Sequence, residues 1–105
     1  MPRDLIHRAV TDQDNHLVGY VRDVLIDELD WKVRFLPITV RGHLGIGDKH
    51  FLIPIEAVER VSKGFVTIEQ SREKVQWAPE LDPRILLQPN LRREIYEYYG
   101  YPLPG

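Results

Sequence analysis

The stretch that decides the fold reads Leu17-Val18-Gly19-Tyr20-Val21-Arg22-Asp23-Val24-Leu25-Ile26-Asp27. Side chains alternate between the two faces of a strand, and Val, Ile and Tyr favour strands, so this run predicts one long strand. The alternation is interrupted at Arg22, and we expect an irregularity within the strand. Gly19 is the candidate for it, because glycine in a strand often marks a bulge or a close approach of two backbones.

Turn chemistry and further strand-like runs lie on both sides of this stretch. Asp12-Gln13-Asp14-Asn15 precedes it, and Asp and Asn side chains can hydrogen-bond their own backbone, which predicts a tight turn. Four other runs have strand character: residues 5–11, 31–41, 49–55 and 65–70. Pro37 lies within one of them and cannot donate to a ladder, so we expect that strand to be an edge strand or to be broken there. Residues 56–61 are compatible with one helical turn.

The composition agrees with a fold dominated by strands. Among the apolar residues, Val and Ile number 19 and Ala only 3, which favours a sheet over a helical bundle. A chain of 105 residues is long enough for one core. We therefore predict a single domain over residues 1–105: a mostly β, small antiparallel barrel of five to six strands in residues 1–70, followed by residues 71–105.

The last part of the chain has a different character. Five of the eight prolines lie in residues 79–105, so we expect an extended, proline-rich arm that covers part of the surface. Asn90 is a good N-cap residue, and apolar side chains recur at helical spacing after it. Gly100 fits the position just after a helix. These signals predict a short C-terminal helix over residues 91–99.

Charge and composition exclude several classes of function. Fourteen basic and sixteen acidic residues are interspersed, giving a net charge of -2, whereas a nucleic-acid-binding surface needs clustered basic residues. The absence of cysteine excludes a disulfide framework, a thiolate nucleophile and a cysteine-based metal centre. No apolar run approaches the ~20 residues needed to span a bilayer. We expect no nucleic-acid partner, no membrane insertion and a cytoplasmic location.

Candidate chemistry in the sequence is sparse. His43, Asp48 and His50 lie in or beside a glycine-rich loop, and imidazole with carboxylate is a ligand set for zinc or iron. A small metal-dependent enzyme or sensor is therefore one alternative. The sequence contains no recognisable nucleophile elbow. We expect the chain not to be an enzyme and to bind no cofactor.

Aromatic and apolar residues gather near the C-terminus, where four of the five tyrosines fall within residues 96–101. One helix cannot direct all of them into one core, so we predict that some of this surface contacts a protein partner or a second copy of the chain in a homodimer. The alternative is that the helix only covers an open end of the barrel. The candidate interaction surface consists of Trp77, Leu81, Ile85, Leu91, Ile95, Tyr96, Tyr98, Tyr99 and Tyr101.

The order and spacing of these runs resemble the PRC-barrel family. The shared pattern is the turn Asp14-Asn15, the run from Leu17 to Asp27, then Val33-Arg34-Phe35-Leu36, then Phe51-Leu52-Ile53-Pro54-Ile55-Glu56-Ala57-Val58. Two further pieces resemble the continuation found in the cytoplasmic domain of the photosynthetic reaction-centre H subunit: Trp77-Ala78-Pro79-Glu80-Leu81-Asp82-Pro83 and Glu94-Ile95-Tyr96-Glu97-Tyr98-Tyr99-Gly100.

The resemblance implies a small, mostly antiparallel barrel that serves as an assembly and docking module, with no common catalytic residues. It makes a non-enzymatic protein-interaction module the first expectation. A ribosome-maturation adaptor of the RimM type, which binds a ribosomal protein, is the alternative that the same family implies.

Overall fold

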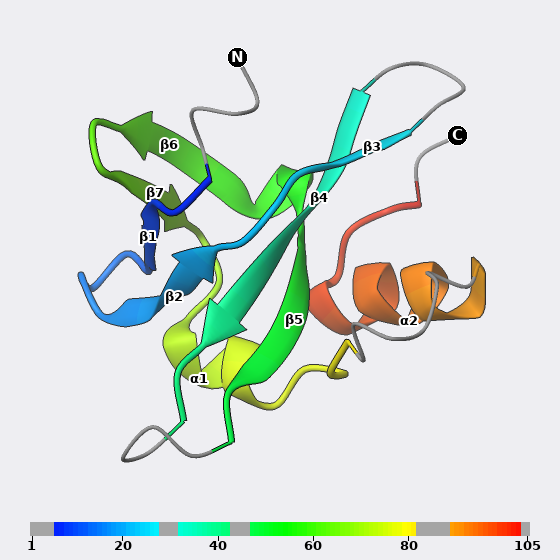
Figure 1. The fold of residues 1–105 in the computed structure, drawn as a ribbon. Helices are drawn as coiled ribbons and strands as arrows, with labels where there is room; N and C mark the ends of the chain where they lie inside the picture. Colours follow the sequence, from blue (N-terminus) through cyan, green and yellow to red (C-terminus); the bar gives the residue numbers. More distant parts are fainter. Residues whose placement is uncertain (1–5, 28–31, 43–46, 82–88, 104–105) are drawn as a thin grey trace.

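The computed structural model describes residues 6–27, 32–42, 47–81 and 89–103. Figure 1 shows a curled sheet with one long helix beside it. In chain order the elements are β1 (Ala9–Thr11), β2 (Leu17–Val21), β3 (Leu25–Asp27), β4 (Lys32–Val40), β5 (Lys49–Pro54), the 3-10 helix η3 (Ile55–Ala57), β6 (Val58–Ser62), β7 (Phe65–Ile68), α1 (Arg72–Gln76) and α2 (Pro89–Tyr99).

The strands form one sheet in the order β3-β4-β2-β1-β7-β6, and β5 pairs with the other side of β4. The pairing is antiparallel except between β1 and β7, which are parallel. The predicted fold class, mostly β with a C-terminal helix, is confirmed. No helix in the described part of the chain has both the length and the apolar character needed to cross a membrane.

The prediction of one strand over residues 17–27 is wrong, because the chain leaves the sheet after Val21 and rejoins it at Leu25. Both segments pair with β4, which stays unbroken through Pro37 and has partners on both sides, so the expectation of an edge or broken strand is also wrong. The carbonyl of Pro37 faces the gap between β2 and β3, where it accepts a hydrogen bond from Arg22 N at 2.8 Å. Pro37 has no N–H to return a bond to the Arg22 carbonyl, so the β2–β4 ladder ends at the Val21–Ile38 pair.

Gly19 lies where two backbones approach closely, as expected. The β1–β2 register shifts between Val10, which pairs with Gly19, and Thr11, which pairs with Leu17. A Cβ at Gly19 would lie 2.6 Å from the carbonyl oxygen of Thr39 on β4, closer than real Cβ contacts come. Glycine is therefore required for β2 to pack between β1 and β4.

The helical turn expected over residues 56–61 is only partly present. The 3-10 helix ends at Ala57, and residues from Val58 onward form β6. Val58 pairs with Ile68 and Val61 with Val66, so pairing with β7 overrides the local helical preference.

Two corrections concern the C-terminal part of the chain. Residues 72–76 form α1, where an extended arm was predicted. Ser71 caps this helix, and its Oγ accepts a hydrogen bond from Lys74 N at 3.1 Å.

The helix predicted over 91–99 is confirmed but begins at Pro89, so Asn90 lies in its first turn instead of capping it. Gly100 adopts φ +82° and donates its N–H to the Tyr96 carbonyl at 3.0 Å, as expected after a helix end. Residues 77–81 of the predicted arm form neither helix nor strand, and residues 82–88 lie outside the described residues.

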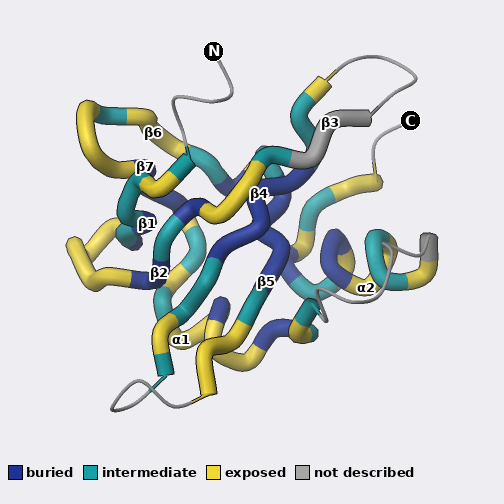
Figure 2. The backbone as a smooth tube through the Cα atoms, viewed as in Figure 1, coloured by how far each residue is buried: buried dark blue, intermediate teal, exposed yellow. Residues whose placement is uncertain are grey.

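The core extends from the sheet to α2, and the buried segments in Figure 2 lie along β4, β5 and α2. One row of paired residues, Val21, Ile38 and Phe51, faces this core and is almost wholly buried. Its neighbouring row, Tyr20, Thr39 and His50, points to the opposite face of the sheet. The same three strands thus present two surfaces with different chemistry.

Candidate functional site

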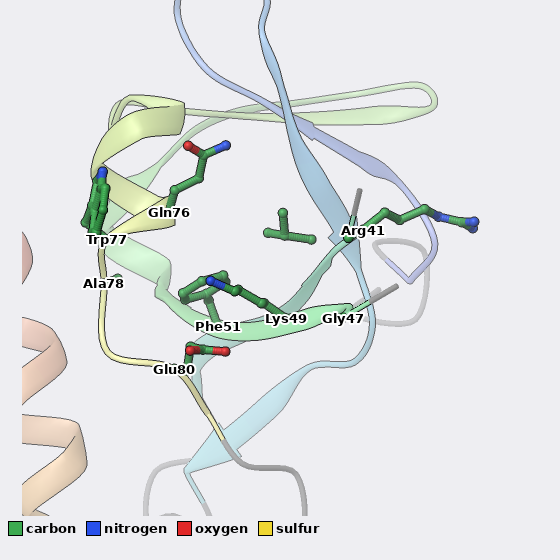
Figure 3. A pocket seen from close by; sticks show the side chains of 10 residues that line it. Arg41, Gly47, Lys49, Phe51, Gln76, Trp77, Ala78 and Glu80 are labelled. Carbon is green, nitrogen blue, oxygen red and sulfur yellow. The ribbon is translucent and has the colours of Figure 1, made fainter. Parts of the chain in front are cut away.

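A hollow of about 710 Å³ opens between the β4–β5 end of the sheet and the segment that begins with α1 (Figure 3). We call it the Trp77 hollow. It is lined by Val40, Arg41, Gly42, Gly47, Lys49, Phe51, Gln76, Trp77, Ala78 and Glu80. Its volume is in the range of small-molecule and peptide sites.

Trp77 is the most exposed large apolar side chain among the described residues. Its side chain is 82% accessible, although a buried indole would contribute far more to stability. Its backbone is nevertheless held firmly: the next N–H, that of Ala78, donates to the Val75 carbonyl at 3.1 Å, and Leu81 N donates to the His50 carbonyl on β5 at 2.8 Å. The fold therefore holds the backbone at Trp77 in place and leaves the indole in solvent, outside the core.

Asp12 connects the start of α1 to the β1–β2 turn. It is 2% exposed, and its Oδ1 accepts hydrogen bonds from the backbone N–H groups of Asp14 and His16, both at 2.9 Å. Its Oδ2 accepts from Arg72 N at 3.0 Å and lies 3.2 Å from His16 Nδ1. Burial acts to raise the pKa of Asp12, but these hydrogen bonds outweigh burial and leave the pKa below its usual value. An ionised Asp12 thus holds the short helix that leads into Trp77.

The polar side chains of the Trp77 hollow carry both signs of charge. Lys49 and Glu80 both extend beside Phe51 (Figure 3). Arg41 lies at the margin, and its guanidinium points away from the hollow (Figure 3), 5.6 Å from the centre of the Tyr20 ring. The hollow therefore combines an apolar base, an exposed indole and one charge of each sign.

The residues predicted to form an interaction surface divide into three groups. Ile95, Tyr96 and Tyr99 are buried in the core, which makes them packing residues in this structure. Leu81, Leu91, Tyr98 and Tyr101 are partly buried against the core. Trp77 alone among the described members is largely exposed, and Ile85 lies outside the described residues. The role of this set in binding stays a prediction, now centred on Trp77.

The tyrosines hold α2 against the rest of the fold. Tyr96 donates from its hydroxyl to Glu56 Oε1 at 3.1 Å and meets Phe35 edge to face, with ring centres 5.4 Å apart. Burial, together with Glu56, raises the pKa of Tyr96 to about 12. Tyr98 donates to the Lys74 carbonyl of α1.

Tyr99 and Tyr101 lie at the end of α2. Tyr101 accepts from Gln70 Nε2 at 2.8 Å. The Tyr99 hydroxyl is buried with no hydrogen-bond partner among the described residues, and burial raises its pKa. The alternative foreseen from the sequence, that the helix only covers an open end of the barrel, stays a prediction; α2 packs against β4 through the contact of Tyr96 with Phe35.

The proposed metal ligands are only partly described. His43 lies outside the described residues, and one oxygen of Asp48 accepts a hydrogen bond from Gly42 N at 2.9 Å. His50 Nδ1 lies 3.2 Å from the Arg22 guanidinium, which places a positive charge beside that nitrogen. The metal site of His43, Asp48 and His50 therefore stays a prediction without support from its described members.

A different trio, Asp12, Asp14 and His16, brings its potential ligand atoms within 4.8 Å of one another. Both oxygens of Asp12 already accept hydrogen bonds. The hydrogen bonds of Asp12 therefore explain why these three residues lie close together: they form a turn that supports α1.

Sequence reasoning found Trp77 but not the residues around it. Lys49 and Phe51 lie on β5, whereas Glu80 follows α1, and no local motif joins these two segments. Asp12 was assigned to a turn, which is correct, but its contact with Arg72 depends on the packing of α1.

Comparisons with known proteins place the chain in a family. The model of the PRC-barrel domain matches residues 2–75, whereas no curated protein sequence gives a significant match. Among solved structures, the chain is similar to one described as a 16S ribosomal RNA processing protein, RimM, from Pseudomonas aeruginosa. The two chains share 18% sequence identity, and their TM-score is 0.49. The match covers 70% of this chain and 44% of the RimM chain, so this chain spans less than half the length of the RimM chain. The likeness of residues 77–100 to the H-subunit continuation lies beyond the matched range and stays a prediction. Because the family model matches residues 2–75, which is most of the chain, the chain belongs to the PRC-barrel domain family.

Proposed function

We propose that this chain is a non-enzymatic protein-interaction module that assembles as a homodimer through the Trp77 hollow. The observation that carries the proposal is the 82% exposed indole of Trp77, fixed beside a hollow whose lining includes Phe51. Tryptophan is enriched among the residues that contribute most to protein interfaces, because it buries a large area with few rotatable bonds.

The charges around Trp77 favour a second copy of the chain as the occupant. A two-fold interface places the same patch on both subunits, so the patch must complement itself. Lys49 and Glu80 provide one positive and one negative charge at the same hollow. Across a two-fold axis, Lys49 of one subunit can face Glu80 of the other, while the two indoles enter the facing hollows.

The edge of the sheet at β6 is a poorer route to a dimer. β6 presents Glu59 and Arg60 to solvent, and its register with β7 shifts between Val58 and Arg60. Charged side chains and bulges are devices that prevent edge-to-edge pairing. We therefore expect assembly to bury Trp77 and to leave β6 uncovered.

Sedimentation velocity over a range of protein concentrations tests the proposal. We expect the native chain to dimerise and Trp77→Ala to sediment as a monomer. Lys49→Glu should weaken the dimer by placing two acidic side chains opposite each other. Combining Lys49→Glu with Glu80→Lys should restore it, because the charges are exchanged and remain complementary.

Glu97→Lys is the matched control, since Glu97 is exposed on α2 and lies outside the hollow. It should dimerise as the native chain does. A native chain that stays monomeric at all concentrations would exclude the proposal. A Trp77→Ala variant that dimerises as tightly as the native chain would move the interface elsewhere.

A further inference from the structure

We propose that the outer face of β2, β4 and β5 carries a binding site for a small oxyanion, the phosphate or carboxylate group of a small molecule. We call it the Arg22 site. A cavity of about 540 Å³ lies there, lined by His7, Tyr20, Val21, Arg22, Thr39, Arg41 and Asp48. This inference does not depend on the proposed dimer.

The register separates this site from the Trp77 hollow. Tyr20 pairs with Thr39, and Thr39 pairs with His50, so these three side chains share the outer face. Val40 and Lys49, which line the Trp77 hollow, form the neighbouring pair and point to the other face. Arg41 directly follows β4 and lies two residues after Thr39, so it belongs to the same outer face. Its guanidinium lies over the Tyr20 ring at 5.6 Å.

Two guanidinium groups at this site are positioned by neutral partners. Arg22 Nη1 lies 3.2 Å from His50 Nδ1; because a guanidinium only donates, the histidine nitrogen accepts. Arg41 rests on the Tyr20 ring. Neither arginine forms an ion pair with a carboxylate among the residues that the structure describes. Both positive charges are therefore oriented but not neutralised there.

A neutral donor accompanies the two charges. Tyr20 and Thr39 line the cavity, and the Tyr20 hydroxyl can donate to an anion. The Thr39 hydroxyl lies 3.3 Å from the accepting His50 Nδ1 and donates to it, so His50 connects Thr39 to Arg22. Guanidinium and hydroxyl groups are donors that suit phosphate and carboxylate oxygens.

The remaining lining residues are consistent with this chemistry. His7 adopts φ +72°, and its N–H donates to the Val21 carbonyl at 2.7 Å, which holds its segment over the edge of the site. Asp48 is the acidic lining residue, and one of its oxygens is used by Gly42 N. When the histidines are neutral, Arg22 and Arg41 carry two positive charges and Asp48 carries one negative charge. The net positive charge of the site attracts an anion.

The test is a two-dimensional NMR titration of the 15N-labelled chain with sodium phosphate, and separately with sodium acetate, at constant ionic strength maintained with sodium chloride. We expect saturable shifts at the amides of Tyr20, Arg22, Thr39 and Arg41 with at least one of the two anions. A response to phosphate but not acetate would identify a phosphate-bearing ligand, and the reverse result a carboxylate.

Arg22→Gln should weaken the binding about tenfold, because it removes one charged hydrogen-bond donor group. Arg93→Gln is the matched control, since Arg93 is exposed on α2, and it should bind as the native chain does. If Arg22→Gln alters the spectrum outside the site, Arg41→Gln takes its place with the same expected loss.

Three results would overturn the inference. One is a linear response to both anions, spread over all basic residues; another is saturation at Lys49 and Trp77 instead of the outer face. The third is an unchanged affinity in both arginine variants. Trp77→Ala should leave the anion response intact, so failure of the dimer and failure of the Arg22 site are separate outcomes.

Discussion

Replacing Asp12 by asparagine should destabilise the chain by about 3 kcal/mol at pH 7. The carboxylate accepts four hydrogen bonds, two on each oxygen, from Asp14 N, His16 N, Arg72 N and His16 Nδ1. Asparagine keeps one oxygen and places an NH2 group against the donors of the other. Two hydrogen bonds to a charged, buried acceptor are then lost, each contributing about 1.5–3 kcal/mol. We take the lower end of that range because the His16 side chain is exposed and can turn to water.

Urea unfolding followed by circular dichroism measures this loss. For a slope of about 1.5 kcal/mol per molar, the midpoint should fall by about 2 M, with the slope unchanged. Asp14→Asn is the control: Asp14 is exposed in the same turn, and it contributes its backbone N–H, not its carboxylate, to the network. It should shift the midpoint by less than about 0.3 M, as surface substitutions usually do.

The pH dependence separates a charge effect from a packing effect. The pKa of Asp12 lies below its ordinary value of 3.8, so the stabilisation is complete above pH 3.8 and is lost as the pH falls through the lowered pKa. The amide of the Asp12→Asn variant cannot titrate in this way. The difference in unfolding free energy between the native chain and Asp12→Asn should therefore shrink below about pH 4. A difference that stays constant from pH 7 to pH 3 would refute the reasoning.

Three further predictions use the same urea assay. Gly19→Ala should cost about 2–3 kcal/mol because its Cβ would overlap a backbone carbonyl, whereas Gly64→Ala, at φ +93° with open space around it, should cost only about 1 kcal/mol; equal losses would contradict the close approach. Tyr96→Phe should cost about 1 kcal/mol through the lost hydrogen bond to Glu56. Because the pKa of Tyr96 is raised to about 12, its stabilisation is complete below pH 10 and is lost as the pH rises toward 12. Tyr96→Phe has no hydroxyl to titrate, so it should lose less stability over that interval than the native chain does. Trp77→Ala should change the stability of the monomer by less than about 0.5 kcal/mol; a larger loss would show that the indole supports the fold.

The sequence predicted elements well where local chemistry and tertiary context agree. The end of α2 at Gly100 follows from glycine's freedom to adopt positive φ, a local property. Gly19 was identified from its position within a strand, although the partner it approaches, Thr39, lies on another strand. Pro37 was misplaced because the cost of a missing N–H depends on the neighbouring strands: only the bond that would return to Arg22 is absent, and the pairing of β4 with β5 continues through Pro37.

The candidate site was only half predictable. Tryptophan is large and apolar, so the sequence indicated that Trp77 needs a surface to pack against. The sequence could not show that the core of the same chain leaves Trp77 exposed. Ile95, Tyr96 and Tyr99 were assigned to the same surface, and the structure buries all three. Which side of a helix faces the sheet depends on where the helix lies, and that position depends on contacts between residues far apart in the chain.

The amino-acid order by itself determined the fold class, the family pattern and the end of the C-terminal helix, because strand alternation, turn residues and helix caps are properties of short segments. Only the tertiary structure decided that β4 is central, that Asp12 holds α1, and that opposite faces of the same strands carry the Trp77 hollow and the Arg22 site. The physical reason is that register sets faces: pairing Tyr20, Thr39 and His50 in one row, and Val21, Ile38 and Phe51 in the next, directs one row outward and the other inward.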